Sequence, residues 1–338
     1  MATKLRWGIL ATGGIARKFA LDLPRSRTGR LVAVGSRSRA SAEKFAAEHG
    51  GVRAHASYGA LLADPEVEAV YISNPHPGHF EWTLHAAAAG KHILCEKPVA
   101  MRRADAGRMI AAAREHRVFL MEAFMYRCHP QTAKIAALVA DGAIGRMRAI
   151  RASFNFARPF EAGHRLYNRA LGGGGILDIG CYPVSFSRRM AGAAQGLPFV
   201  EPVEFKAVGA RLPQTGVDDY AAAVALFPGD IVAELSCGTT VRHEIAARLH
   251  GEAGWIDVPW PFAPGINPGD DRITLHRNGC DPETIACPAP SLYGQEADTV
   301  AEAVAAGALE SPAMSHADTL GNMAVLENWL AQAGVRYD

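Results

Sequence analysis

The chain has 338 residues, of which 49% are hydrophobic and 20% are charged, and its net charge at pH 7 is +1. This length predicts two domains, because single domains usually comprise about 100 to 200 residues. The near-neutral charge argues against a protein that binds nucleic acid or an anionic membrane surface, because both partners attract basic proteins.

Signals for export and for membrane insertion are not found. The start, Met1 to Leu10, passes into a strand-like run without the apolar core of a secretory signal, and no run reaches the roughly 18 apolar residues of a membrane span. The six cysteines are scattered, which argues against a zinc site and a small disulfide scaffold. We therefore expect a soluble, cytoplasmic protein with reduced thiols.

Short apolar runs alternate with helical patterns over residues 1–123. The predicted strands are Leu5–Leu10, Leu31–Gly35, Ala69–Ile72, His92–Cys95 and Val118–Met121. The predicted helices are Ile15–Leu23, Ala40–His49, His79–Ala89 and Ala104–His116. This alternation predicts a parallel sheet with helices on both faces, whose ligands bind beyond the carboxyl ends of the strands.

The loop after the first predicted strand is similar to a dinucleotide-binding turn. Against the pattern G-x-G-x-x-G/A, it places Ala11 at the first glycine and Gly13 at the second. Gly13 would let the backbone approach a pyrophosphate at a helix N-terminus, where N–H groups and the helix dipole favour anions. The cofactor-binding residues predicted here are Ala11, Thr12, Gly13, Gly14 and Ile15.

The end of the second predicted strand indicates which dinucleotide binds. An NAD site has Asp or Glu here, which accepts a hydrogen bond from the ribose 2′-hydroxyl. This chain instead has Ser36, Arg37 and Arg39, which suit a 2′-phosphate. We therefore predict NADP as the cofactor; the alternative is that both arginines are simply solvated at a strand end.

Two further loops open on the same edge of the sheet. One contains the predicted cofactor contacts Ser73, Asn74, Pro75 and His79, and the other contains Glu96 and Lys97. Lys97 would lie beside the nicotinamide and favour the phenolate form of a nearby tyrosine. At about 4 Å and an effective dielectric near 20, this attraction is at most about 4 kcal/mol, enough to lower a tyrosine pKa from about 10 towards about 7. The alternative for Lys97 is a strand-end surface residue in an exposed salt bridge with Glu96. The alternative for His79 is an ordinary histidine at the start of a helix.

Period-2 alternation predicts a strand over residues 147–156. Strand-like runs follow at Val203–Leu212, Tyr220–Phe227, Ile231–Cys237, Ile245–Gly251 and Trp255–Val258. Runs such as residues 221–225 offer apolar side chains to both faces of a sheet, so we expect a homodimer or homotetramer formed through the open face. The last predicted helix, residues 316–333, has the spacing of a helix packed in a core.

A run of four glycines at 172–175 precedes Asp178 and Tyr182. If a helix begins near Gly174, the two side chains share one face and can point into one site, where Tyr182 could act as a base. Because glycines cost ordering entropy and have no side chain to pack, we expect them to let the backbone approach a ligand. The alternative is a mobile loop before a core helix in which Tyr182 is merely buried.

Other polar residues are candidates for the substrate site. Arg148, Asn155 and Arg165 are predicted to bind substrate hydroxyls, with solvated surface positions as the alternative. The histidines lack the close helical spacing of a metal site, and hydride transfer to a nicotinamide needs no metal. We therefore predict no metal.

Four stretches, residues 8–16, 89–98, 122–130 and 172–183, together resemble the glucose-fructose oxidoreductase / inositol dehydrogenase (Gfo/Idh/MocA) family over nearly the whole chain. Tyr182 and the 122–130 stretch resemble the branch that holds NADP-dependent D-xylose dehydrogenases and dimeric dihydrodiol dehydrogenases. The resemblance implies a Rossmann domain with a parallel sheet over residues 1–123. It also implies a substrate-binding and oligomerisation domain over residues 124–338, with an open, mostly antiparallel sheet and a last helix that packs back on the first domain.

The same resemblance assigns roles to residues. It implies Lys97 and Tyr182 as a catalytic pair, Asp178 as a residue that orients substrate or lysine, and a cis bond before Pro98. In the 122–130 stretch, Glu122 is expected to bind substrate and Arg127 the cofactor. The expected reaction moves a hydride between NADP and the carbinol carbon of an aldose-type sugar or a dihydrodiol. The alternatives are a keto- or anhydro-sugar reductase and a non-catalytic NADP-sensing regulator.

Overall fold

The computed structural model describes residues 4–337, which form two compact units. The first unit runs up to Cys128 and also contains Pro290–Leu320, and the second comprises His129–Ala289 and the chain from Gly321 onward. The sequence analysis placed the domain boundary after residue 123, slightly before Cys128. It also placed residues 290–320 in the second domain, whereas they belong to the first unit.

The first unit is built on sheet A, whose six strands are all parallel and follow the order β3-β2-β1-β4-β5-β6. The strands are β1 (Leu5–Leu10), β2 (Gly29–Gly35), β3 (Arg53–His55), β4 (Ala69–Ile72), β5 (His92–Glu96) and β6 (Leu120–Ala123). The strand order reverses between β1 and β4, so the loops after these strands flank the point where such folds bind ligands. The predicted parallel α/β sheet is thus confirmed.

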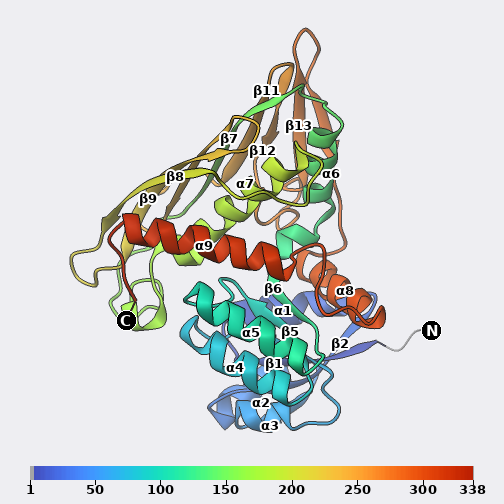
Figure 1. Ribbon diagram of the computed structural model, residues 1–338. Helices are drawn as coiled ribbons and strands as arrows, with labels where there is room; N and C mark the ends of the chain where they lie inside the picture. The colour runs from blue at the N-terminus through green and yellow to red at the C-terminus, as the bar shows by residue number, and fades with distance from the viewer. Residues whose placement is uncertain (1–3, 338) are drawn as a thin grey trace. The chain divides into compact units, whose positions relative to one another are not determined.

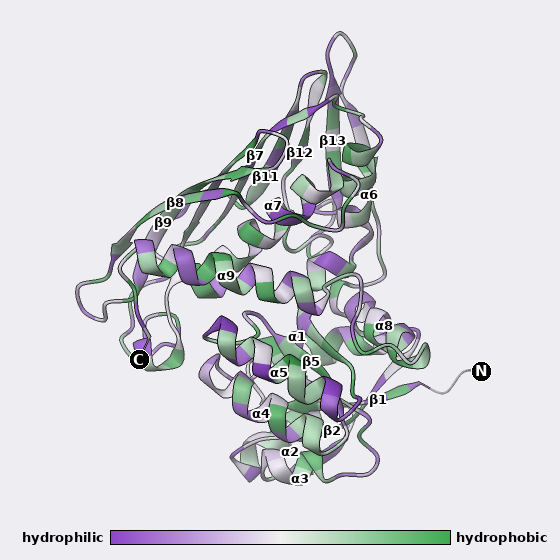
Figure 2. Ribbon diagram, in the orientation of Figure 1, coloured by the Kyte–Doolittle hydropathy of each residue, from purple (hydrophilic) through white to green (hydrophobic). Residues whose placement is uncertain are grey.

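Helices pack around sheet A (Figure 1). They are α1 (Gly14–Asp22), α2 (Arg39–Glu48), α3 (Tyr58–Leu62), α4 (Pro77–Ala88), α5 (Arg103–Glu115) and α8 (Leu292–Ala305). Helix α5 carries both hydrophilic and hydrophobic residues (Figure 2). Its buried residues are Ala106, Met109, Ile110 and Ala113. This spacing of three and four residues is the mark of a helix that covers a core with one face.

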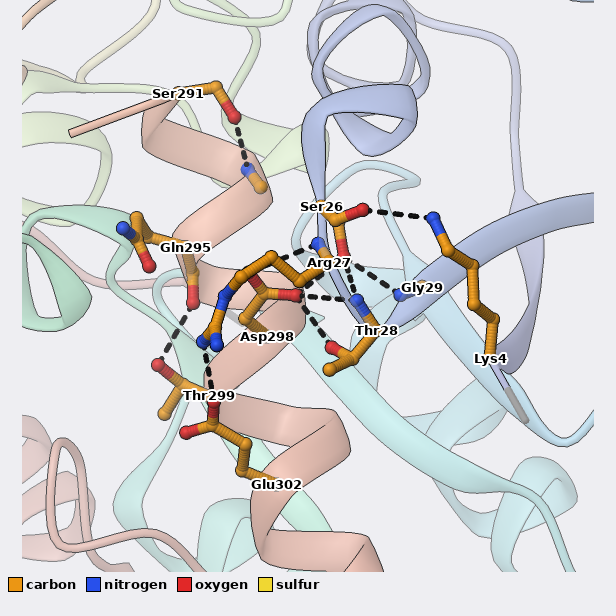
Figure 3. Close-up of polar contacts among 11 residues, drawn as sticks. Lys4, Ser26, Arg27, Thr28, Gly29, Ser291, Gln295, Asp298, Thr299 and Glu302 are labelled. Atoms are coloured by element: carbon orange, nitrogen blue, oxygen red, sulfur yellow. Dashed lines mark hydrogen bonds and ion pairs between the residues drawn. The ribbon is translucent and has the colours of Figure 1, made fainter. Parts of the chain in front are cut away.

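Helix α8 belongs to the first unit because its Asp298 is bound to the loop between α1 and β2 (Figure 3). Asp298 accepts hydrogen bonds from the hydroxyls of Ser26 (2.6 Å) and Thr28 (2.5 Å) and from the backbone N–H of Thr28 (3.0 Å). It also pairs with Arg27 at 3.4 Å. Several bonds to one buried carboxylate fix this late segment of the chain on the first unit.

The second unit is built on sheet B, whose eight strands follow the order β14-β13-β12-β11-β7-β10-β9-β8. They are β7 (Met147–Asn155), β8 (Glu204–Arg211), β9 (Asp218–Phe227), β10 (Ile231–Gly238), β11 (Ala246–Gly251), β12 (Gly254–Val258), β13 (Arg272–Arg277) and β14 (Glu283–Ala286). Every pairing is antiparallel except that of β7 with β10. The expectation of a mostly antiparallel second sheet is confirmed.

The two faces of sheet B differ. Helix α7 (Cys181–Ala193) packs on β7 and β10, and α6 (Pro130–Ala140) lies beside α7 (Figure 1). The opposite face carries a hollow of about 1030 Å³, lined in part by Val208, Ala222 and Val224.

Helix α9 (His316–Gln332) begins in the first unit and ends in the second. Among residues 4–337, no helix has the length and apolar character needed to cross a membrane.

Candidate active site

The turn after β1 has the geometry of a dinucleotide-binding loop. Ala11, which replaces the first glycine of the fingerprint, has a φ of 87°, in the left-handed region that normally favours glycine. Gly13 is the N-cap of α1, and within 4 Å a Cβ atom built on Gly13 or Gly14 would meet no described atom beyond its chain neighbours and its own helix. The backbone N–H groups at the start of α1 therefore border open space, which fits the pyrophosphate of a dinucleotide.

At the end of β2, the predicted 2′-phosphate residues have different neighbours. Ser36 is buried, and its hydroxyl accepts a hydrogen bond from the backbone N–H of Ser38 at 3.3 Å. The Arg37 guanidinium lies close enough to the Tyr58 hydroxyl to oppose the rise in the Tyr58 pKa that burial causes. Arg39 pairs with Glu43 at 3.4 Å on the surface of α2. Arg37 thus lies beside the Tyr58 hydroxyl at the end of β2, whereas Arg39 pairs with a residue of its own helix.

His79 supports the two neighbouring loops. Its ring is fully buried, with Nδ1 2.9 Å from the Pro98 carbonyl oxygen and Nε2 2.8 Å from the Asn74 carbonyl oxygen. Burial lowers its pKa to about 4, and the charge of Lys97 acts in the same direction. The ring is therefore neutral at physiological pH. His79, a predicted cofactor contact, thus connects the loop after β4 to the loop after β5.

Lys97 follows β5 within a network that holds its backbone. The Lys97–Pro98 bond is cis, as the resemblance implied. Glu96 accepts a hydrogen bond from the Tyr71 hydroxyl, and its second oxygen lies 3.3 Å from the backbone nitrogen of Lys97. On the other side of the bond, Glu122 accepts from the backbone N–H of Val99 at 2.9 Å. Glu96 and Glu122, predicted to contact cofactor and substrate, both support this turn.

Arg127 also makes contacts inside the first unit. Its guanidinium pairs with Asp318 at 2.5 Å and donates to the Ala313 carbonyl at 3.0 Å, with both charged side chains only 2% exposed. Opposite charges within hydrogen-bond distance favour both charged forms. Arg127, a predicted cofactor contact, thus fastens the turn Met125–Cys128 to the start of α9.

In the second unit, Asp178 lies in a π-helical turn, Ile176–Gly180, and Tyr182 lies in the first turn of α7. The sequence predicted one regular helix from about Gly174; instead, a wider turn precedes the α-helix and carries Asp178. π-Turns are rare and recur at functional sites. Asp178 is buried and forms a two-point pair with Arg165, at 2.8 Å and 3.4 Å. Two of the predicted substrate residues are therefore brought together.

Tyr182 is 4% exposed and is surrounded by aromatic rings. Its ring centroid lies 5.2 Å from that of Phe154 and 5.5 Å from that of Phe262. These distances are typical of paired aromatic side chains. Neither phenylalanine was predicted as a site residue: Phe154 could have been found on the alternating strand, whereas Phe262 lies in a loop with no distinguishing pattern.

The structure does not bring Arg148 and Asn155 to Tyr182. Arg148 is exposed and pairs with Glu252 at 3.3 Å. Asn155 donates to the Ser236 hydroxyl at 3.3 Å, and it follows Phe154 on β7, so the two side chains point to opposite faces of the sheet. Their contacts are thus with the sheet itself.

The glycine run is packed against protein atoms, not left open for a ligand. A Cβ on Gly173 would lie 2.7 Å from the Leu166 carbonyl oxygen, and one on Gly174 would collide with the Asp218 carboxylate. Gly174 also has a φ of 106°. The expectation that these glycines serve ligand approach is therefore wrong. They are required because neighbouring protein groups approach their backbone closely.

Known proteins resemble this chain along almost its full length. The family model "Oxidoreductase family, NAD-binding Rossmann fold" matches residues 5–124, and "GFO/IDH/MocA C-terminal domain" matches residues 132–257. The trans-1,2-dihydrobenzene-1,2-diol dehydrogenase of Danio rerio is 33% identical, covering 98% of both chains. The NADP(+)-dependent D-xylose 1-dehydrogenase of Hypocrea jecorina is 33% identical, covering 98% of this chain and 93% of its own. The crystal structure of KijD10, a 3-ketoreductase from Actinomadura kijaniata in complex with NADP and TDP-benzene, has a TM-score of 0.84 and 28% identity over 98% of both chains.

Proposed function

Because the chain belongs to the Gfo/Idh/MocA family of oxidoreductases, we propose that it is an NADP-dependent dehydrogenase acting on an aldose-type sugar or a dihydrodiol. The observation that carries this proposal is the full-length similarity to two enzymes that both act on carbinol carbons. The open backbone at Gly13 and Gly14 and the cationic strand end at Arg37 support NADP as the cofactor. When bound, NADP⁺ accepts the hydride that leaves the substrate carbon.

The residues of this chain supply proton transfer and orientation. Tyr182 takes the hydroxyl proton as the carbinol carbon becomes a carbonyl, and Lys97 stabilises the phenolate that this step requires. Asp178, held by Arg165 at two points, orients the substrate hydroxyls. Proton transfer and hydride transfer together complete the oxidation, and the reverse steps give reduction.

The test uses the purified protein, NADP⁺, D-xylose and a trans-dihydrodiol, with the absorbance of reduced nicotinamide as the readout. We expect Tyr182→Phe and Lys97→Met each to lower kcat about 100-fold or more without changing the NADP⁺ dissociation constant. The double variant should be little worse than either single variant, because the two groups act as one unit. Tyr220→Phe, on the open side of sheet B, is the matched control. Unchanged turnover in Tyr182→Phe would refute the proposal.

The likeness to a 3-ketoreductase supports a second candidate, the NADPH-dependent reduction of a keto-sugar. Assaying a keto-sugar with NADPH beside D-xylose with NADP⁺ separates the two directions. Tight NADP binding with no turnover of any sugar or diol would instead favour an NADP-sensing regulator.

We further propose that the protein forms a homo-oligomer through the open face of sheet B. Val208, Val224 and Val232 lie on that face and are 71%, 49% and 40% exposed. An apolar group of this kind on neighbouring strands is typical of an interface. Val224→Lys should therefore dissociate the protein in light scattering at micromolar concentration, whereas Leu21→Lys, at an exposed position of the first unit, should not. A strictly monomeric wild type would refute this proposal. The cytoplasmic location stays a prediction from the sequence.

A further inference from the structure

One buried carboxylate has no place in the proposed reaction. Asp218 is the first residue of β9 and is fully buried. Its Oδ2 accepts a hydrogen bond from the backbone N–H of Ile176 at 2.6 Å, and the N–H of Gly175 lies close enough to this carboxylate to lower its pKa. These N–H groups open the π-helical turn and have no partner within it, so Asp218 caps the turn from a distant strand.

The glycine run is shaped around this carboxylate. Gly174 adopts the left-handed backbone, and its missing Cβ leaves the space that Asp218 fills. A Cβ on Gly175 would lie 3.2 Å from the same side chain. Substitution of either glycine would therefore push the turn and the carboxylate apart.

A second contact comes from the end of the chain. The Tyr337 hydroxyl donates a hydrogen bond to the Gly173 carbonyl oxygen. Burial raises the Tyr337 pKa, and the charge of Asp218 adds to the rise, so the phenol remains a neutral donor. The two side chains thus hold consecutive peptide groups of one short segment.

The held segment leads directly to the two residues assigned to the chemistry. Asp178 is two residues after Ile176, and Tyr182 is the second residue of α7. Gly173 meanwhile lies against the backbone of Arg165 and Leu166, which brings Arg165 to Asp178. A shift at residues 174–176 would therefore displace both site residues.

We propose that Asp218 is a positioning residue that sets the start of the turn carrying Asp178 and Tyr182, with Tyr337 as its assistant. This inference rests on the proposed function for the role of Tyr182, but the capping itself does not. The carboxylate is retained in this position at a cost, because burial disfavours its charged form. Burial raises its pKa to about 7 and Asp219 adds to the rise, whereas the N–H groups of Ile176 and Gly175 oppose it. The other titratable groups facing it are Tyr337 and Cys237.

The first experiment measures kcat, KM and the NADP⁺ dissociation constant with D-xylose and NADP⁺. We expect Asp218→Ala to lower kcat at least 10-fold, because displacement by about 1 Å can cost up to about 100-fold, while NADP⁺ binding stays unchanged. Asp218→Asn, which keeps an acceptor oxygen, should restore kcat to within about threefold of wild type. Asp219→Ala, which removes a hydrogen bond from Thr240 and the neighbouring charge but leaves the cap in place, is the control and should match wild type.

The second experiment measures hydrogen exchange, which needs no turnover. Amide exchange at Gly175 and Ile176 should be at least 10-fold faster in Asp218→Ala than in wild type. If Asp218→Ala does not fold, Tyr337→Phe takes its place and should speed exchange over residues 173–176 and lower kcat severalfold. Wild-type exchange and wild-type kcat in these variants would overturn the inference. Faster exchange in a protein that turns over no sugar or diol would refute the proposed function and leave the cap standing.

Discussion

Glu296 offers the sharpest test of the electrostatics inside the first unit. It lies on α8, it is fully buried, and neither carboxyl oxygen has a hydrogen-bond partner among residues 4–337. Burial raises its pKa well above the usual value, and the nearby charge of Glu96 raises it further. The folded protein therefore keeps a proton on Glu296 that the unfolded chain releases.

The size and sign of the effect follow from proton linkage. An unfolded glutamate releases its proton around pH 4.3, whereas folded Glu296 retains it, so the wild-type free energy of unfolding falls as the pH rises. Each pH unit costs at most about 1.36 kcal/mol, so the loss from pH 5 to pH 7 is at most about 2.6 kcal/mol. Glu296→Gln carries no titrating group and escapes this loss. The stability of the variant relative to wild type should therefore increase with pH, by up to about 2.6 kcal/mol over this interval.

Urea unfolding at pH 5, 6 and 7, followed by tryptophan fluorescence, measures this difference. Glu302→Gln is the control, because Glu302 lies on the same helix with its side chain 58% exposed. We expect its free energy of unfolding to run parallel to that of wild type across the three pH values. Parallel lines for Glu296→Gln as well would refute the reasoning, because they would mean that folded Glu296 has already lost its proton.

Three further predictions concern other parts of the first unit. Asp298→Ala should lower the free energy of unfolding by about 2 to 4 kcal/mol in urea, because it leaves the buried Ser26 hydroxyl and two partly buried donors of Thr28 without their acceptor. A loss below about 1 kcal/mol would contradict this. Ala11→Gly should be neutral or stabilising by up to about 1 kcal/mol. Glycine removes the strain of an alanine in the left-handed region, but it also raises the conformational entropy of the unfolded chain. Clear destabilisation would mean that Ala11 is not strained. Arg37→Ala should weaken NADP⁺ binding at least 10-fold in calorimetry while leaving NAD⁺ binding unchanged, and equal losses for both cofactors would oppose a 2′-phosphate contact.

The parallel sheet was readable from the sequence because its central strands are continuous apolar runs, and β1 and β4 match their predicted bounds. Some of the missed elements are short or exposed, but α6 and α8 were also missed although they have 11 and 14 residues. β3 has three residues and α3 has five, while β14 buries none of its side chains. Such segments are formed by pairing with neighbours, and their own residues show little periodicity.

The site was predicted in its residue types more fully than in its geometry. Spacing alone brought Asp178 and Tyr182 together as candidates, but it could not distinguish a π-turn from an α-helix. The pair Arg165–Asp178 and the cap by Asp218 depend on contacts between segments far apart in the sequence. For the same reason, nothing in the pattern of residues 290–320 indicated that Asp298 binds the loop before β2.

The discontinuous first unit has a consequence for biosynthesis. Its nucleotide-binding sheet is encoded by the first 128 residues, yet the helix that binds Ser26 and Thr28 is translated only after nearly all of the second unit. During synthesis, part of the apolar surface of this sheet therefore stays uncovered until α8 has been translated. Such a partly folded state is prone to aggregation. A truncation at residue 128 would make this partly folded state permanent, whereas a shortened chain that joins residues 290–320 to it would supply the missing cover.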